Sequence, residues 1–142
     1  MRKMKAYVIA ISSLVAVLTL NVQSIFAASV TYWAPSFLSP NGSYYSNSTF
    51  DMTSLDLTIN GYQYLPGFST ARSTKYQIVV KGFFSDDVKG EKIVTGYYPK
   101  DGTWFNDSIH VSTTFTPPKG VTVKITNLSS VDGDNVSGNG YQ

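Results

Sequence analysis

One histidine is the only imidazole available for acid–base chemistry in this sequence of 142 residues. His110 stands in an alternating segment, and Ser108 and Ser112 lie two residues away on either side. A serine hydrolase needs a serine, a histidine and a carboxylate in mutual contact. Side chains at positions i and i+2 of a strand run parallel and about 6.6 Å apart, so neither serine is placed to give its proton to His110. We therefore expect a surface histidine and no enzyme activity.

The acidic residues give no sign of paired-carboxyl catalysis or of a metal site. Seven of the nine fall in expected turns or at strand ends, where Asp is common. The turn at Asp132-Gly133-Asp134-Asn135 offers three oxygen-bearing side chains, but calcium takes six to eight oxygen ligands. The chain has no cysteine, which excludes a disulfide framework and thiolate metal ligands. We expect neither a metal nor a cofactor.

Aromatic side chains are the one marked excess, at 14% of the chain. Several stand in adjacent pairs, and adjacent residues of a strand face opposite sides of the sheet, so one ring of each pair is expected outside the core. Ring faces can stack on sugars or bases, and rigid Tyr and Trp give large contact areas at low entropic cost. The residues that we expect in a ligand-binding surface are Trp33, Tyr97, Tyr98 and Trp104. The alternative interpretation of the aromatic excess is ordinary cross-strand pairing of aromatic residues.

The N-terminal segment has the three-part layout of a secretory signal peptide. A cationic stretch, residues 1–5, precedes an apolar run of 15 residues, 6–20, and a more polar stretch that ends in small residues. The run is shorter than the roughly 20 residues of a membrane-spanning helix. We expect residues 1–27 to be a signal peptide cleaved after Ala27, and the mature chain to have no transmembrane anchor.

Removal of this segment changes the charge balance. The whole chain has 11 basic and 9 acidic residues, and loss of Arg2, Lys3 and Lys5 leaves 8 basic against 9 acidic. A mature chain of net charge −1 gives no electrostatic reason to bind nucleic acid.

Residues 28–142 alternate with period two between clusters of Gly, Pro, Asn and Asp, which is typical of strands joined by turns. A strand is expected over residues 75–84 and a charged loop over 85–91, and the dipeptide Asn60-Gly61 favours a tight turn. Seven or eight strands with turns every 8–12 residues predict a single all-β domain, an antiparallel β-sandwich of Greek-key or jelly-roll type.

These features favour a small secreted, non-enzymatic binding module, extracellular or cell-wall associated, whose aromatic residues contact a glycan, a cell-wall polymer or a protein. A secreted toxin or bacteriocin-like protein that acts on membranes or competitor cells is the second hypothesis. It rests on the weakly charged alternation of Ser and Thr with apolar residues over 108–116, which is also the composition of membrane-inserting hairpins.

Overall fold

The structure is a computed structural model that describes residues 27–113 and 116–142. The expected signal peptide, residues 1–27, therefore lies outside the described residues except for Ala27. In the described part the chain forms eight strands and no helix. The strands are β1 (Ser29–Trp33), β2 (Ser43–Tyr45), β3 (Asp56–Tyr64), β4 (Arg72–Val80), β5 (Asp87–Gly96), β6 (Phe105–His110), β7 (Thr122–Asn127) and β8 (Asn135–Tyr141).

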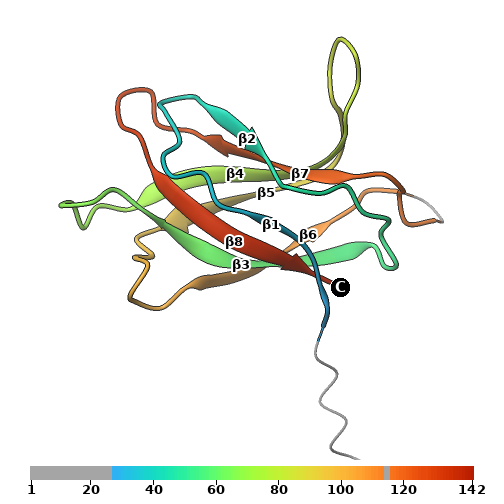
Figure 1. Cartoon of the computed structure of the whole chain (residues 1–142), viewed down its shortest axis with the longest axis horizontal. Coiled ribbons are helices and arrows are strands. Elements are labelled where there is room, and N and C mark those ends of the chain that lie inside the picture. Colours follow the sequence, from blue (N-terminus) through green and yellow to red (C-terminus); the bar gives the residue numbers. More distant parts are fainter. Residues whose placement is uncertain (1–26, 114–115) are drawn as a thin grey trace, which may run out of the picture.

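Two antiparallel four-stranded sheets form a β-sandwich (Figure 1), as the alternation predicts. The strand orders are β1-β8-β3-β6 and β2-β7-β4-β5. The pairs β1–β8, β2–β7, β3–β6 and β4–β5 are nested one inside the next, as in a long hairpin rolled over on itself. This nesting is the jelly-roll form of the sandwich.

The core lies between the two sheets and consists of alternate residues of the central strands. Leu57 and Ile59 of β3 face Ile78 of β4 and Val123 and Ile125 of β7, and all five are fully buried. A chain of touching aromatic rings runs through this core, with centroid separations of 5.4–5.7 Å, in the order Trp33, Tyr76, Phe105, Tyr98. The buried rings thus reach from β1 to the connection between β5 and β6.

Three of the local expectations were wrong. The strand expected over residues 75–84 ends at Val80, and residues 81–84 belong to the connection to β5. Asn60 and Gly61 lie inside β3 and form no turn. A Cβ on Gly61 would lie 2.3 Å from the carbonyl oxygen of Ser137, so glycine is needed there for close strand approach. The charged residues after Asp87 belong to β5, because an edge strand can carry charges along its exposed side.

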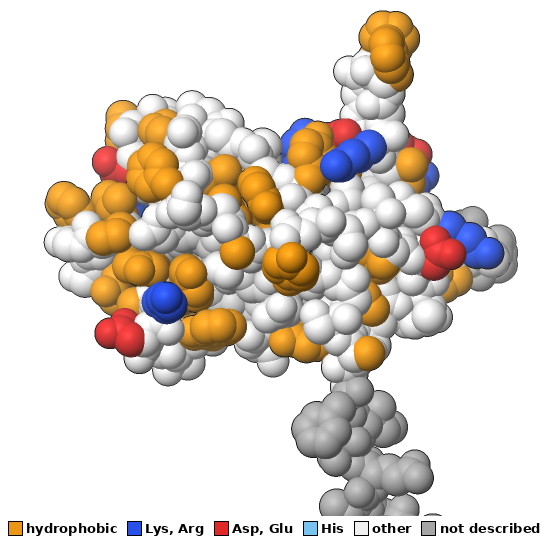
Figure 2. All heavy atoms as spheres, in the orientation of Figure 1, with side chains coloured by type: hydrophobic (Ala, Val, Ile, Leu, Met, Phe, Trp, Pro, Cys, Tyr) orange, Lys and Arg blue, Asp and Glu red, His pale blue; other side chains and the backbone are white. Residues whose placement is uncertain are grey.

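The two ends of the sandwich differ in what they expose. Figure 2 shows hydrophobic side chains gathered over the left-hand end and at the tip of a loop that stands clear of the body. β4 joins the two regions, since it begins at Arg72 near the first and ends at Val80 before the loop. No helix in residues 27–113 and 116–142 is long and apolar enough to cross a membrane.

Candidate functional site

Trp33 does not lie on an open surface, and the expectation that it would was wrong. Its side chain is fully buried against Tyr76, while its neighbour Tyr32 is 52% exposed. Gly61 and Gly138 lie opposite each other on β3 and β8, and a Cβ on Gly138 would lie 2.7 Å from Cζ2 of Trp33. Gly138 leaves the space that the indole fills, and Trp33 faces inward while Tyr32 faces outward.

The other three expected residues lie at one end of the sandwich, in or beside the connection from β5 to β6. Tyr97 and Trp104 are 41% and 38% exposed, whereas Tyr98 is half-buried and packs against the core. Trp104 donates a hydrogen bond from Nε1 to the carbonyl oxygen of Lys100, at 3.0 Å. This bond fixes the orientation of the exposed indole.

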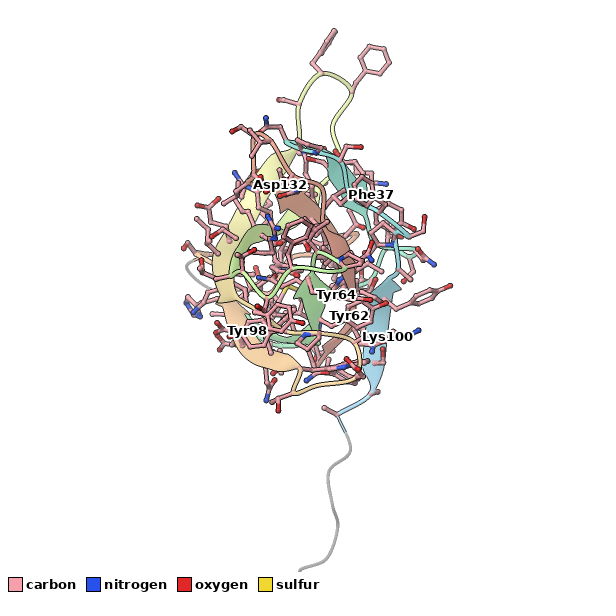
Figure 3. All side chains as sticks on the ribbon, turned by 90° about the vertical axis from the view of Figure 1, so that its left-hand side faces the viewer. Phe37, Tyr62, Tyr64, Tyr98, Lys100 and Asp132 are labelled. Atoms are coloured by element: carbon pink, nitrogen blue, oxygen red, sulfur yellow. The ribbon has the colours of Figure 1, made fainter. Side chains whose placement is uncertain are left out.

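Two tyrosines of β3 extend the surface that Trp104 begins. The ring of Tyr62 lies 5.5 Å from that of Trp104 and 5.8 Å from that of Tyr64, in edge-to-face contact with both. We call Tyr62, Tyr64 and Trp104 the aromatic platform. Figure 3 faces this end of the molecule and labels Tyr62 and Tyr64 there, with Lys100 and Tyr98 nearby. Neither tyrosine was among the expected site residues.

A row of three asparagines and one tyrosine crosses the sheet beside the platform. The strand register places Tyr32 of β1, Asn139 of β8, Asn60 of β3 and Asn106 of β6 next to one another. Tyr32, Asn139 and Asn60 each lie between two buried neighbours, and the exposed Asn106 follows the buried Phe105 and pairs with Asn60, so all four lie on the outer face of the sheet. We call these four residues the amide row. It is about 14 Å long, because neighbouring strands are about 4.8 Å apart.

The next two rows toward the platform end are also uncharged. Ser137 lies opposite Tyr62, and Asn135 lies opposite Tyr64. The outer face of the second sheet is different, because its register places Lys124 beside Gln77 and Gln77 beside Glu91. These three rows of the first sheet therefore carry no charged side chain, whereas Asp56 and His110 lie on the same outer face toward its other end.

A buried carboxyl lies beneath the platform end. Asp134, fully buried, accepts a hydrogen bond from Oγ1 of Thr74 at 3.2 Å. Burial raises the pKa of this carboxyl to about 6, although the Thr74 bond, the Arg72 charge and the backbone N–H groups of Asn135 and Tyr64 oppose the rise. Asp134 thus ties the end of β3, which carries Tyr64, to β4 and β8.

The turn that contains Asp134 uses its oxygens within the protein. Asp132 forms an ion pair with Arg72 at 3.0 Å, and the Asp134 carboxyl is buried. In the described part of the chain, no group of three or more His, Asp or Glu side chains is placed to share a metal ion.

His110 has a partner that its sequence neighbours did not indicate. Asp56 lies opposite it in the register of β3 and β6, and its Oδ1 is 2.9 Å from Nδ1 of the imidazole. Both side chains are exposed, and within the described residues His110 makes no hydrogen bond to a serine or threonine hydroxyl. The carboxylate–histidine contact is present, and the arrangement lacks the nucleophile contact of a triad.

Comparison with protein-family models, curated proteins and solved structures finds no match to this chain.

Proposed function

We propose that this protein is a secreted, non-catalytic module that binds a neutral polysaccharide across the outer face of the β1-β8-β3-β6 sheet. The observation that carries the proposal is the amide row lying beside the aromatic platform on an uncharged part of one sheet face. The expected signal peptide supports a place outside the cell, in the medium or at the cell wall.

The chemistry of the face matches that of a sugar chain. An asparagine amide both donates and accepts hydrogen bonds, as do sugar hydroxyls. The platform rings offer apolar faces for the C–H faces of sugar rings, and their mutual contacts fix them before any ligand arrives. A neutral polymer meets no charge in the three rows concerned, whereas a polyanion would gain nothing there.

The length of the face favours a polymer over a single sugar. The amide row crosses all four strands, and the platform continues the contact surface to the end of the sheet. A chain that lies across both touches several residues at once, and such contacts add in a way that one sugar unit cannot reproduce.

Retention in affinity gels tests the proposal. The purified protein is run through gels that contain β-glucan, xylan, mannan, starch or soluble chitin oligomers, with polygalacturonate as an anionic comparison. We expect retention by at least one neutral polymer and a loss of affinity of at least about tenfold in Trp104→Ala and in Asn106→Ala.

Ile93→Ala provides the matched control, because Ile93 is half-exposed on the second sheet. Its retention should equal that of the unmodified protein. Equal retention of all three variants, or retention by polygalacturonate alone, would contradict the proposal.

A further inference from the structure

A loop between β4 and β5 carries two exposed phenylalanines at its tip. Residues 81–86 make this connection, and Phe83 and Phe84 are 95% and 96% exposed. Figures 1 and 2 show the loop standing clear of the sandwich, with hydrophobic side chains at its end. We call residues 81–86 the finger. Rings this exposed add nothing to the core, so their presence requires another explanation.

The tip of the finger has a fixed shape. A Cβ on Gly82 would lie 2.0 Å from the carbonyl oxygen of Ser85, so the chain closes this turn only with glycine at that position. The two rings contact each other edge to face, with centroids 4.9 Å apart. The sequence thus places two phenylalanines side by side at the apex of a tight turn.

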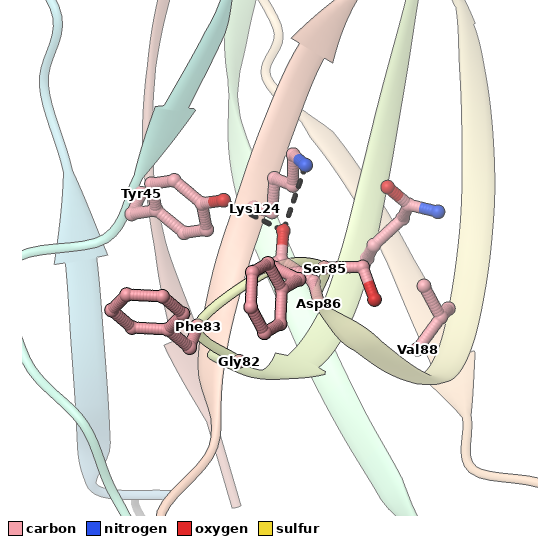
Figure 4. Close-up of a pocket in the computed structure, with 9 residues that line it drawn as sticks. Tyr45, Gly82, Phe83, Ser85, Asp86, Val88 and Lys124 are labelled. Carbon is pink, nitrogen blue, oxygen red and sulfur yellow. Dashed lines mark hydrogen bonds and ion pairs between the residues drawn. The ribbon is translucent and has the colours of Figure 1, made fainter.

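Polar side chains hold the base of the finger against two neighbouring strands. Asp86 accepts hydrogen bonds from the hydroxyl of Tyr45 at 2.6 Å and from Nζ of Lys124 at 2.8 Å. Nζ of Lys81 lies 4.2 Å from the centre of the Tyr45 ring. Residues at both ends of the finger therefore contact Tyr45. Figure 4 shows the bonds that Tyr45 and Lys124 make to Asp86. We call Tyr45, Lys81, Asp86 and Lys124 the collar.

The collar holds two lysines and one aspartate, so Asp86 neutralises one of the two positive charges and leaves a net charge of +1. The hydrogen bond from Lys124 lowers the pKa of Asp86, and the same bond raises the pKa of Lys124, so both groups are ionised at neutral pH. An apolar tip above a weakly cationic base follows the layering of a membrane leaflet, in which hydrocarbon lies beyond the headgroups.

The area of the tip separates a lipid partner from a protein partner. Two phenylalanines bury about 300–500 Å² together, which is well below the roughly 800 Å² per partner of a stable protein interface. A bilayer accepts two rings without a matching cavity. We propose that the finger inserts Phe83 and Phe84 into the interfacial layer of a lipid bilayer, with the collar at the level of the headgroups.

Vesicle binding tests this proposal independently of polysaccharide binding. The protein is purified from the culture medium and its N-terminus is sequenced. It is then sedimented with phosphatidylcholine vesicles and with vesicles that also contain phosphatidylglycerol. We expect binding to both, since the two rings supply most of the affinity, and a modest preference for the phosphatidylglycerol vesicles that salt removes, since the collar has a net charge of +1. Burial of each ring contributes about 10- to 100-fold, so Phe83→Ser/Phe84→Ser should weaken binding by at least about 100-fold.

The matched control is Phe68→Ser, which changes an exposed ring in the loop between β3 and β4. It should leave vesicle binding unchanged. The double variant should keep the melting temperature and the polysaccharide retention of the unmodified protein, because its two rings touch neither the core nor the amide row.

A tryptophan at the tip reports insertion directly. Phe84→Trp is made together with Trp104→Phe, so that the buried Trp33 is the only other indole. Vesicles should shift its emission to shorter wavelength, and lipids brominated near the headgroup should quench it. Unshifted tryptophan emission would overturn the proposal. So would vesicle binding by Phe83→Ser/Phe84→Ser equal to that of the unmodified protein, or dimerisation through the finger without lipid.

Discussion

Tyr62 and Trp104 meet edge to face, with ring centroids 5.5 Å apart, although 41 positions separate them in the chain. Tyr62 projects from the outer face of β3, and Trp104 stands at the start of β6 with its indole tied to the backbone of Lys100. The proposed polysaccharide therefore meets a surface whose two largest rings already hold fixed positions, which lowers the entropic cost of binding.

Truncation of Trp33 should damage the fold and not merely a surface. Trp33→Ala removes a fully buried indole from the core, and we expect a loss of about 3–5 kcal/mol in the free energy of unfolding. Urea denaturation measures it. Tyr32→Ala, one residue earlier and half-exposed, should cost less than about 1 kcal/mol. Equal losses for the two variants would contradict the inward placement of Trp33.

The buried Asp134 carboxyl should make stability depend on pH. Its pKa in the folded protein is about 6, above the ordinary value of 3.8, so the folded state holds this proton to higher pH than the unfolded state does. The contribution of Asp134 to the free energy of unfolding is therefore most favourable below about pH 4 and falls as the pH rises toward 6. Above pH 6 the free energy of unfolding is lower by about 3 kcal/mol than it is below pH 4 on account of this group.

Comparison with Asp134→Asn isolates this carboxyl from the others. Unfolding free energies are measured in urea at pH 4, 5, 6 and 8 for both proteins. The difference between variant and unmodified protein should shift in favour of the variant as the pH rises. A difference that stays constant between pH 4 and pH 8 would show that Asp134 does not titrate in this way.

Gly61→Ala should weaken the contact between β3 and β8. The added methyl would lie 2.3 Å from the carbonyl oxygen of Ser137 and 3.0 Å from Cα of Gly138, so the two strands must separate. We expect a loss of about 1–3 kcal/mol, read as a lower melting temperature. An unchanged melting temperature would mean that the two strands approach less closely than described.

Metal removal should leave the fold intact. Asp132 pairs with Arg72 and the Asp134 carboxyl is buried, so this turn offers too few accessible oxygens to hold a metal ion. The melting temperature should be the same with and without EDTA. A decrease of more than about 5 °C, which corresponds to about 1 kcal/mol for a domain of this size, would reveal a structural ion.

The sequence was sufficient for the fold class because alternation and turn residues are local signals. Period-two segments between Gly- and Pro-containing turns lead to strands in a sandwich, and the described residues form eight strands. The turn expected at Asn60-Gly61 was wrong because the same dipeptide that favours a turn also permits close approach between strands. The expected strand to Phe84 was too long, since the same alternation continues past Val80 into the finger.

The site was only partly predictable from the sequence, because its residues come from strands that lie far apart along the chain. Trp104 and Tyr97 stood out as residue types beside a turn, and both are exposed. The amide row depends on the register of β1, β8, β3 and β6, and its members come from four strands spread over the whole domain. The inward turn of Trp33 likewise depends on Gly138, which pairs with it across the sheet.

The most direct test of the proposed polysaccharide face is to observe its amides during a titration. Signals of side-chain NH₂ groups in a ¹⁵N-labelled sample are followed as an oligosaccharide of the retained polymer is added. The account predicts shifts for Asn60, Asn106 and Asn139 and for the Trp104 indole, with the Gln77 amide on the second sheet unmoved. Unmoved asparagine signals at saturating oligosaccharide, or shifts that centre on Gln77, would contradict the account.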